Sequence, residues 1–128
     1  MLSEDEVASL LAAPDPTTTL GRRDRAILET MYSAGTRAAE TVGLNQGDLD
    51  LDRGVGRVLG KGRKERLVAI GRFAVEALRE TLMDPLRPAP TRGSEDALFL
   101  NRSGGRLSTR SLETIVGTHA LPAGITRR

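Results

Sequence analysis

The sequence predicts an α+β fold that is mainly helical and carries one small antiparallel β-sheet. Two kinds of pattern support this prediction. Apolar residues recur at helical spacing in several segments, and these segments are bounded by Ser, Thr, Gly or Pro, the residue types that begin and end helices. Between the helical segments, two short runs alternate apolar and polar residues on either side of a glycine-rich turn, as the strands of a β-hairpin do.

The first third of the chain predicts three helices. Ser3 and Glu6 form a capping-box pattern that begins a helix ending near Ala13, before the Pro-Asp-Pro sequence at 14–16. The second helix runs from about residue 20 to Gly35, and Thr36 caps a third over 37–42. The second helix has an apolar stripe that we expect to lie in the core: Ala26, Ile27, Leu28, Met31 and Tyr32.

The rest of the chain changes character after Asn45. The expected elements are, in order, a turn over 50–54, strands over 55–59 and 66–70 around the charged turn 60–65, a helix over 72–83, a proline-containing loop over 84–94, a short extended piece over 98–100, and a helix over 109–119 that Ser108 caps. Core candidates on the helix over 72–83 are Phe73, Val75, Leu78 and Leu82.

The composition excludes several classes of protein. A chain of 128 residues has the size of one domain, and with two Phe, one Tyr and no Trp its core must be aliphatic. Without cysteine there are no disulfides and no thiol catalysis, which fits a cytoplasmic location. No apolar stretch approaches the roughly 20 residues of a membrane span, and the acidic N-terminus is not a signal peptide. We expect no metal, no cofactor and no membrane partner.

The charge distribution is uneven although the net charge is only +2. Acidic residues gather at 4–6 and 48–52, whereas basic residues gather at 57–72 and 102–110. An anionic partner responds to such local patches rather than to net charge, so the pattern favours nucleic-acid binding. Many soluble proteins carry similar patches, and a generic basic interaction domain is an alternative.

Three local patterns follow one another in a fixed order. The first covers residues 23–40 and ends in Gly35-Thr-Arg-Ala-Ala-Glu40. The second is Asp48-Leu-Asp-Leu-Asp52 leading into Gly60-Lys-Gly-Arg-Lys-Glu-Arg66, and the third is Leu98-Phe-Leu-Asn-Arg-Ser-Gly-Gly-Arg-Leu-Ser108. Together with the intervening hairpin, they resemble the catalytic domain of the tyrosine recombinases, the phage-integrase family, and especially its bacterial Xer members. The resemblance extends from about Leu2 to Ile125, which is nearly the whole chain.

The resemblance implies a site for a DNA phosphodiester. In the family a tyrosine hydroxyl attacks the phosphate, and charge on the non-bridging oxygens is met by guanidinium groups. Arg37 matches the first of these arginines, Lys61 the lysine that acts as general acid, and Glu40 a supporting carboxylate that could orient Arg37 or Lys61. The implied DNA-binding residues are Arg37, Lys61, Arg63, Lys64 and Arg66.

Simpler interpretations of the same residues exist. Arg37 and Glu40 could form an ordinary ion pair at helical spacing, and Lys61 could be a solubilising turn residue. Tyr32 is expected in the core and His119 as an ordinary surface or helix-end histidine. Arg102, Arg106 and Arg110 are weaker candidates for contacts with the DNA backbone.

The family pattern continues beyond these motifs to a His-x-x-Arg box and the nucleophilic tyrosine. Neither Tyr32 nor His119 fits those positions. Residues 1–128 are therefore expected to be a partial, C-terminally truncated catalytic domain without the core-binding domain. It would be inactive alone, would at most bind double-stranded DNA, and could associate with other recombinase subunits or with itself. The alternative is a naturally truncated, non-catalytic module that binds DNA or pairs with a recombinase.

Overall fold

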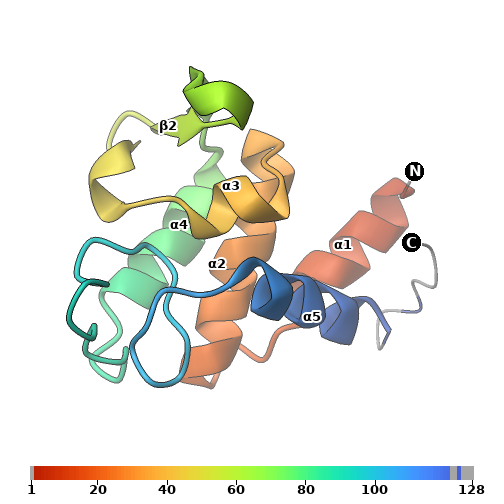
Figure 1. The fold of residues 1–128 in the computed structure, drawn as a ribbon. Coiled ribbons are helices and arrows are strands. Elements are labelled where there is room, and N and C mark those ends of the chain that lie inside the picture. Colours follow the sequence, from red (N-terminus) through yellow and green to blue (C-terminus); the bar gives the residue numbers. More distant parts are fainter. Residues whose placement is uncertain (1, 122–123, 125–128) are drawn as a thin grey trace.

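The computed structural model describes residues 2–121 and residue 124 (Figure 1). It confirms the α+β class, with helices packed beside a three-stranded antiparallel sheet. The elements are α1 (Glu4–Ala12), α2 (Thr19–Ala34), α3 (Ala38–Val42), the 3₁₀ turn η1 (Gln46–Asp48), β1 (Leu49–Asp50), β2 (Val55–Leu59), the 3₁₀ turn η2 (Lys61–Arg63), β3 (Glu65–Ala69), α4 (Arg72–Leu82) and α5 (Thr109–Ala120). None of the helices over residues 2–121 combines the length and the apolarity needed to cross a bilayer.

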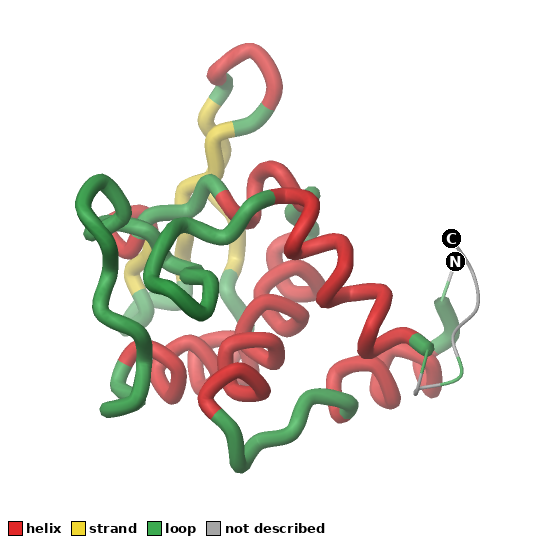
Figure 2. The backbone as a smooth tube through the Cα atoms, turned by 60° about the horizontal axis from the view of Figure 1, so that its bottom comes forward, coloured by secondary structure: helices red, strands yellow, loops and turns green. Residues whose placement is uncertain are grey.

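The sheet has the strand order β1-β2-β3, with both neighbouring pairs antiparallel. Its register places Val58 opposite Arg66 and Leu59 opposite Glu65, so the two long strands are joined by the turn over 60–64. The predicted turn over 50–54 begins one residue too early, because Asp50 pairs with Val55 as part of β1. The β2–β3 hairpin projects beyond the helices, and its turn stands clear of the body (Figure 2).

The core lies between α2 and α4 and is closed by the segment over 97–100 and by α5 (Figure 1). Ile27 of α2, Leu78 of α4 and Leu112 of α5 are fully buried, and Phe99 is the one aromatic residue of this aliphatic core. The segment over 98–100 is extended chain, as expected, and isolated bridges form at Ala97 and Leu100. This core fixes α2, and with it the segment that leads into α3.

Two aromatic residues lie outside the core in which the sequence placed them. Tyr32 is 64% exposed and Phe73 is 55% exposed. Helical spacing places both on the apolar side of their helices, but Tyr32 is near the end of α2 and Phe73 is in the first turn of α4, and both line an open pocket beside α1 instead of packing into the core. The prediction that both are buried is therefore wrong for the described residues.

Candidate nucleic-acid interface

Arg37 lies directly before α3, and its main chain is fixed from both sides. Its N–H donates to the Glu40 carboxylate at 3.0 Å, and its carbonyl accepts the Thr41 hydroxyl at 2.7 Å and the Thr41 N–H at 2.9 Å. Arg37, not the predicted Thr36, is the N-cap residue of α3, because the Thr36 hydroxyl pairs with that of buried Thr41. The peptide of Arg37 is thus immobilised while its side chain is exposed.

The guanidinium of Arg37 has no ion-pair or hydrogen-bond partner among residues 2–121. Its backbone N–H is already used by Glu40, and α3 has only five residues. A phosphate here would therefore be held by the guanidinium, with little help from the helix end. An exposed guanidinium on a fixed backbone suits paired hydrogen bonds to phosphate oxygens.

Lys61 lies on the tight turn between β2 and β3. The turn is closed by a hydrogen bond from the Gly60 N–H to the Lys64 carbonyl at 2.8 Å. Gly62 and Arg63 both have left-handed backbone conformations, with φ of 73° and 60°. Glycine adopts this conformation freely, whereas Arg63 does so at a cost of about 1 kcal/mol. The side chains of Lys61, Arg63 and Lys64 are exposed and make no ion pair with the described part of the chain.

Arg66 differs from the other cations of the hairpin because it has a partner. Its Nη1 donates to Glu40 Oε2 at 2.7 Å and its Nη2 donates to Glu40 Oε1 at 3.1 Å, in a two-pronged ion pair between β3 and α3. Hydrogen bonds from Arg66 and from the Arg37 N–H lower the pKa of Glu40 to about 2, so the carboxylate is ionised at neutral pH. The sequence suggested that Glu40 could orient Arg37 or Lys61; instead it binds the Arg37 main chain and the Arg66 side chain.

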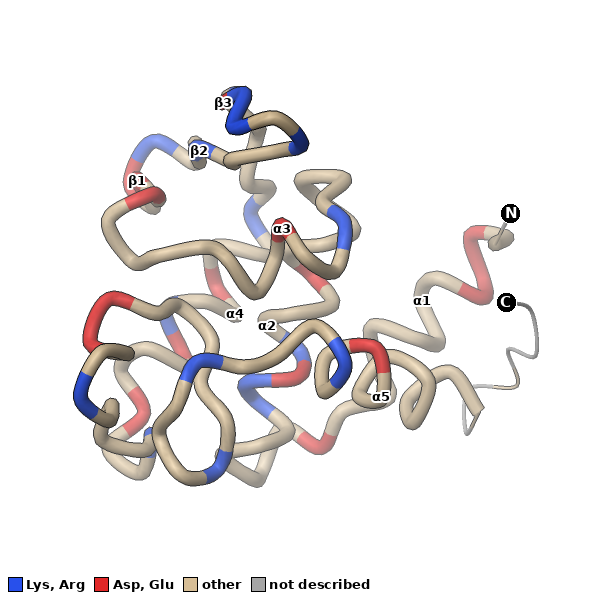
Figure 3. Tube along the Cα trace, in the orientation of Figure 1, with Lys and Arg blue, Asp and Glu red and all other residues tan. Residues whose placement is uncertain are grey.

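Lys and Arg residues gather at the hairpin end, on the side of the molecule where α3 lies (Figure 3). The fold thus joins the α3 and hairpin motifs, which are well separated in sequence, through the contacts of Glu40. Sequence reasoning assigned Arg66 to DNA and missed its pairing with Glu40. The pairing depends on the strand register, which the sequence pattern does not specify.

Arg106 and His119 both have hydrogen-bond partners within the fold. The Arg106 guanidinium donates to the carbonyls of Val42 and Leu44 at 2.9 and 3.1 Å, and also to the side chain of Asn45. His119 lies in the last turn of α5, as expected of a helix-end histidine, and it is half-buried with its Nε2 at 2.8 Å from Asp24 Oδ2. Arg106 therefore secures the end of α3, and His119 joins α5 to α2.

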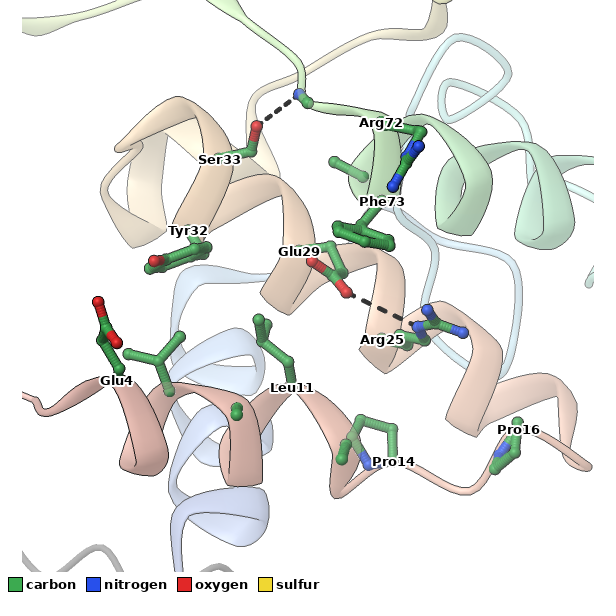
Figure 4. Close-up of a pocket in the computed structure, with 15 residues that line it drawn as sticks. Glu4, Leu11, Pro14, Pro16, Arg25, Glu29, Tyr32, Ser33, Arg72 and Phe73 are labelled. Carbon is green, nitrogen blue, oxygen red and sulfur yellow. Dashed lines mark hydrogen bonds and ion pairs between the residues drawn. The ribbon is translucent and has the colours of Figure 1, made fainter.

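A separate, mostly apolar pocket of about 780 Å³ lies between α1, α2 and the start of α4 (Figure 4). Tyr32 and Phe73 line it, together with the buried Glu29, whose pKa is raised by burial. Arg37, Glu40 and Lys61 do not line this pocket. The sequence's one tyrosine is therefore at a different place from the candidate interface. No group of three or more potential metal ligands occurs within the described residues.

Comparison of the sequence with models of known protein families shows which family the chain belongs to. The model of the phage integrase family matches residues 1–128. The chain belongs to the phage integrase family. Within it, the chain is 42% identical to the tyrosine recombinase XerC of Syntrophus aciditrophicus over all of its length and 43% of the relative's. It is 44% identical to the tyrosine recombinase XerD of Chlorobaculum tepidum over 98% of its length and 42% of the relative's.

Solved structures agree with this membership of the phage integrase family. The XerA recombinase superposes with a TM-score of 0.83 at 28% identity, covering 98% of this chain and 44% of XerA. The XerH site-specific recombinase bound to its difH substrate in a pre-cleavage complex superposes with a TM-score of 0.80 at 26% identity, covering 99% of this chain and 38% of XerH. The chain thus spans less than half the length of these family members.

Proposed function

We propose that residues 1–128 supply the phosphate-binding part of a site-specific DNA recombinase, with double-stranded DNA as the partner. The observation that carries the proposal is the pair of exposed cations, Arg37 and Lys61, on backbones that Glu40 and a closed turn hold in place. Membership of the phage integrase family supports it. The sequence resemblance assigns the family's first arginine to Arg37 and its lysine to Lys61. Arg63 and Lys64 extend the positive charge along the turn.

The two cations suit different steps of phosphoryl transfer. A planar guanidinium at Arg37 can bind two non-bridging oxygens at once and stabilise their charge as a hydroxyl attacks phosphorus. Lys61 carries a compact ammonium on a flexible stem, which can donate a proton to the leaving 5′ oxygen. Such chemistry at chromosomal or mobile DNA would take place in the cytoplasm.

The proposal gives these 128 residues binding without cleavage. A covalent mechanism needs its nucleophile, and Tyr32 lines the apolar pocket rather than the candidate interface. We therefore expect no covalent product when the chain is incubated with a nicked suicide substrate of duplex DNA. A protein–DNA adduct on a denaturing gel would contradict this part of the proposal. The alternative, a non-catalytic module that pairs with a recombinase subunit, would show as co-sedimentation with a full-length relative in the absence of DNA.

Salt-titrated binding to a short duplex tests the DNA-binding proposal. Binding through phosphates weakens as salt rises, with a slope that counts the phosphates neutralised. Arg37→Ala and Lys61→Ala should each weaken binding and reduce that slope by about one. Arg53→Ala is the matched control, because Arg53 is an exposed arginine at the opposite end of the same sheet. Equal affinities and slopes for all four proteins would refute the proposal.

A further inference from the structure

The Glu40–Arg66 ion pair lies against the chain that leads into Lys61. A Cβ atom added at Gly60 would be 3.1 Å from Glu40 Oε2 and 3.4 Å from Arg66 Nη1. Gly60 is also the residue whose N–H closes the turn by bonding the Lys64 carbonyl. The absence of a side chain at Gly60 thus lets the ion pair approach the base of the Lys61 turn.

The same carboxylate reaches the other candidate cation. Glu40 Oε1 accepts hydrogen bonds both from the Arg37 N–H and from Arg66 Nη2. Glu40 is therefore shared by the main chain before α3 and by a side chain of β3. Its side chain is 12% exposed, whereas that of Arg66 is 44% exposed. A change at Arg66 leaves the α3 contacts of Glu40 available, so it separates the hairpin from α3 without removing the Arg37 contact.

We propose that Arg66 is a positioning residue: through Glu40 it holds the Lys61 turn in a fixed place relative to Arg37. The inference rests on the proposed function, since it concerns the same two cations. Nη1 and Nη2 of Arg66 each donate to one carboxylate oxygen of Glu40, and the ion pair as a whole is neutral. Arg66 thus acts on DNA binding by restricting where Lys61 can be, rather than by neutralising a phosphate itself.

The first measurement needs no DNA. In Arg66→Gln, the backbone amides of Lys61 and Gly62 should lose order on the ps–ns timescale, seen as lower ¹⁵N heteronuclear NOE values, while α2 and α4 stay unchanged. Arg66→Lys should restore part of the order, because lysine keeps one charged contact to Glu40. Arg57→Gln is the control, because it removes the same charge from β2, the strand next to β3. Arg57 is also paired with a carboxylate, that of Asp48, at 3.3 Å. An unchanged turn in Arg66→Gln would overturn the inference.

The second measurement uses the dependence of DNA affinity on Lys61. The loss caused by Lys61→Ala is compared in the wild-type, Arg66→Gln and Arg57→Gln chains, at one low salt concentration. If Arg66 positions Lys61, the two substitutions are coupled. Lys61→Ala should then lower the DNA affinity several-fold in the wild-type and Arg57→Gln chains but leave it almost unchanged in the Arg66→Gln chain. A direct phosphate contact by Arg66 predicts that the two losses multiply, and that result would contradict the inference.

The two measurements separate this inference from the proposed function. If Lys61→Ala leaves the affinity of the wild-type chain unchanged, the proposed role of Lys61 fails, whereas the order of the free turn still reports on Arg66. If Lys61→Ala weakens binding but Arg66→Gln alters neither the order of the turn nor the Lys61 dependence, the proposed function stands and the positioning role of Arg66 is refuted. Glu40→Gln gives a second route to the same break, because a neutral amide holds Arg66 less strongly.

Discussion

Arg106 supplies a test of how α3 is held in place. Its half-buried guanidinium makes three hydrogen bonds to groups at the end of α3 and just beyond it, two of them to main-chain carbonyls. Hydrogen bonds from a charged donor contribute about 1–3 kcal/mol each and do not add fully, so Arg106→Ala should lower the free energy of unfolding by about 3 kcal/mol. That is a large part of the roughly 5–15 kcal/mol that stabilises a domain.

The assay is urea unfolding followed by far-UV circular dichroism, with the slope against urea used to check that the transition stays two-state. Arg106→Lys should recover only part of the loss. The lysine ammonium keeps the charge, but it cannot reach all three acceptors that the planar guanidinium reaches. Arg102→Ala is the control on the same loop: Arg102 is exposed and unpaired within the described residues, so its loss should stay within about 0.5 kcal/mol. A loss below 1 kcal/mol for Arg106→Ala, or an equal loss for both variants, would refute this reasoning.

Three further predictions concern other contacts. Asp24→Ala removes the carboxylate that bonds both half-buried His119 and Arg23, so the free energy of unfolding in urea should fall by about 2 kcal/mol; an unchanged midpoint would count against this. Glu40 has a pKa of about 2 when folded, below its ordinary 4.5, so its contribution to stability is complete above about pH 4.5 and is lost as pH falls toward 2. Acid titration of thermal stability should show this loss, and Glu40→Gln should flatten it; parallel curves would argue otherwise. Replacing the exposed Tyr32 and Phe73 together by Ser should reduce self-association in sedimentation at high concentration, whereas a wild-type chain that is monomeric there would remove the premise.

Local sequence patterns were enough to predict most helices and the hairpin, because caps and periodicity act over a few residues. Ser3 and Ser108 cap the helices that they were predicted to cap, and Gly35 ends α2 in a left-handed conformation. The strand β1 was missed because two residues are too short to show alternation. Tyr32 was misplaced because helical spacing identifies an apolar face but not whether another segment covers it.

The candidate site was predictable only as far as its motifs. Arg37 and Lys61 were identified by family resemblance, and the structure shows both exposed on fixed backbones; their roles remain predictions. The pairing of Glu40 with Arg66 joins residues 26 apart and requires the register of β2 against β3. The anchoring of Arg106 to carbonyls at the end of α3 likewise depends on tertiary packing, since its charge alone equally indicated DNA.

The central claim is that Arg37 and Lys61 are the groups that meet a DNA phosphate. The most direct test is side-chain NMR of the chain titrated with a short duplex at low salt, following the Nε–Hε signal of Arg37 and the Nζ signal of Lys61. These two signals should shift together and return as salt rises, while the Nε signals of Arg53 and Arg79, which pair with Asp50 and Asp52, should stay in place. Shifts at Arg53 and Arg79 without shifts at Arg37 and Lys61 would contradict the central claim.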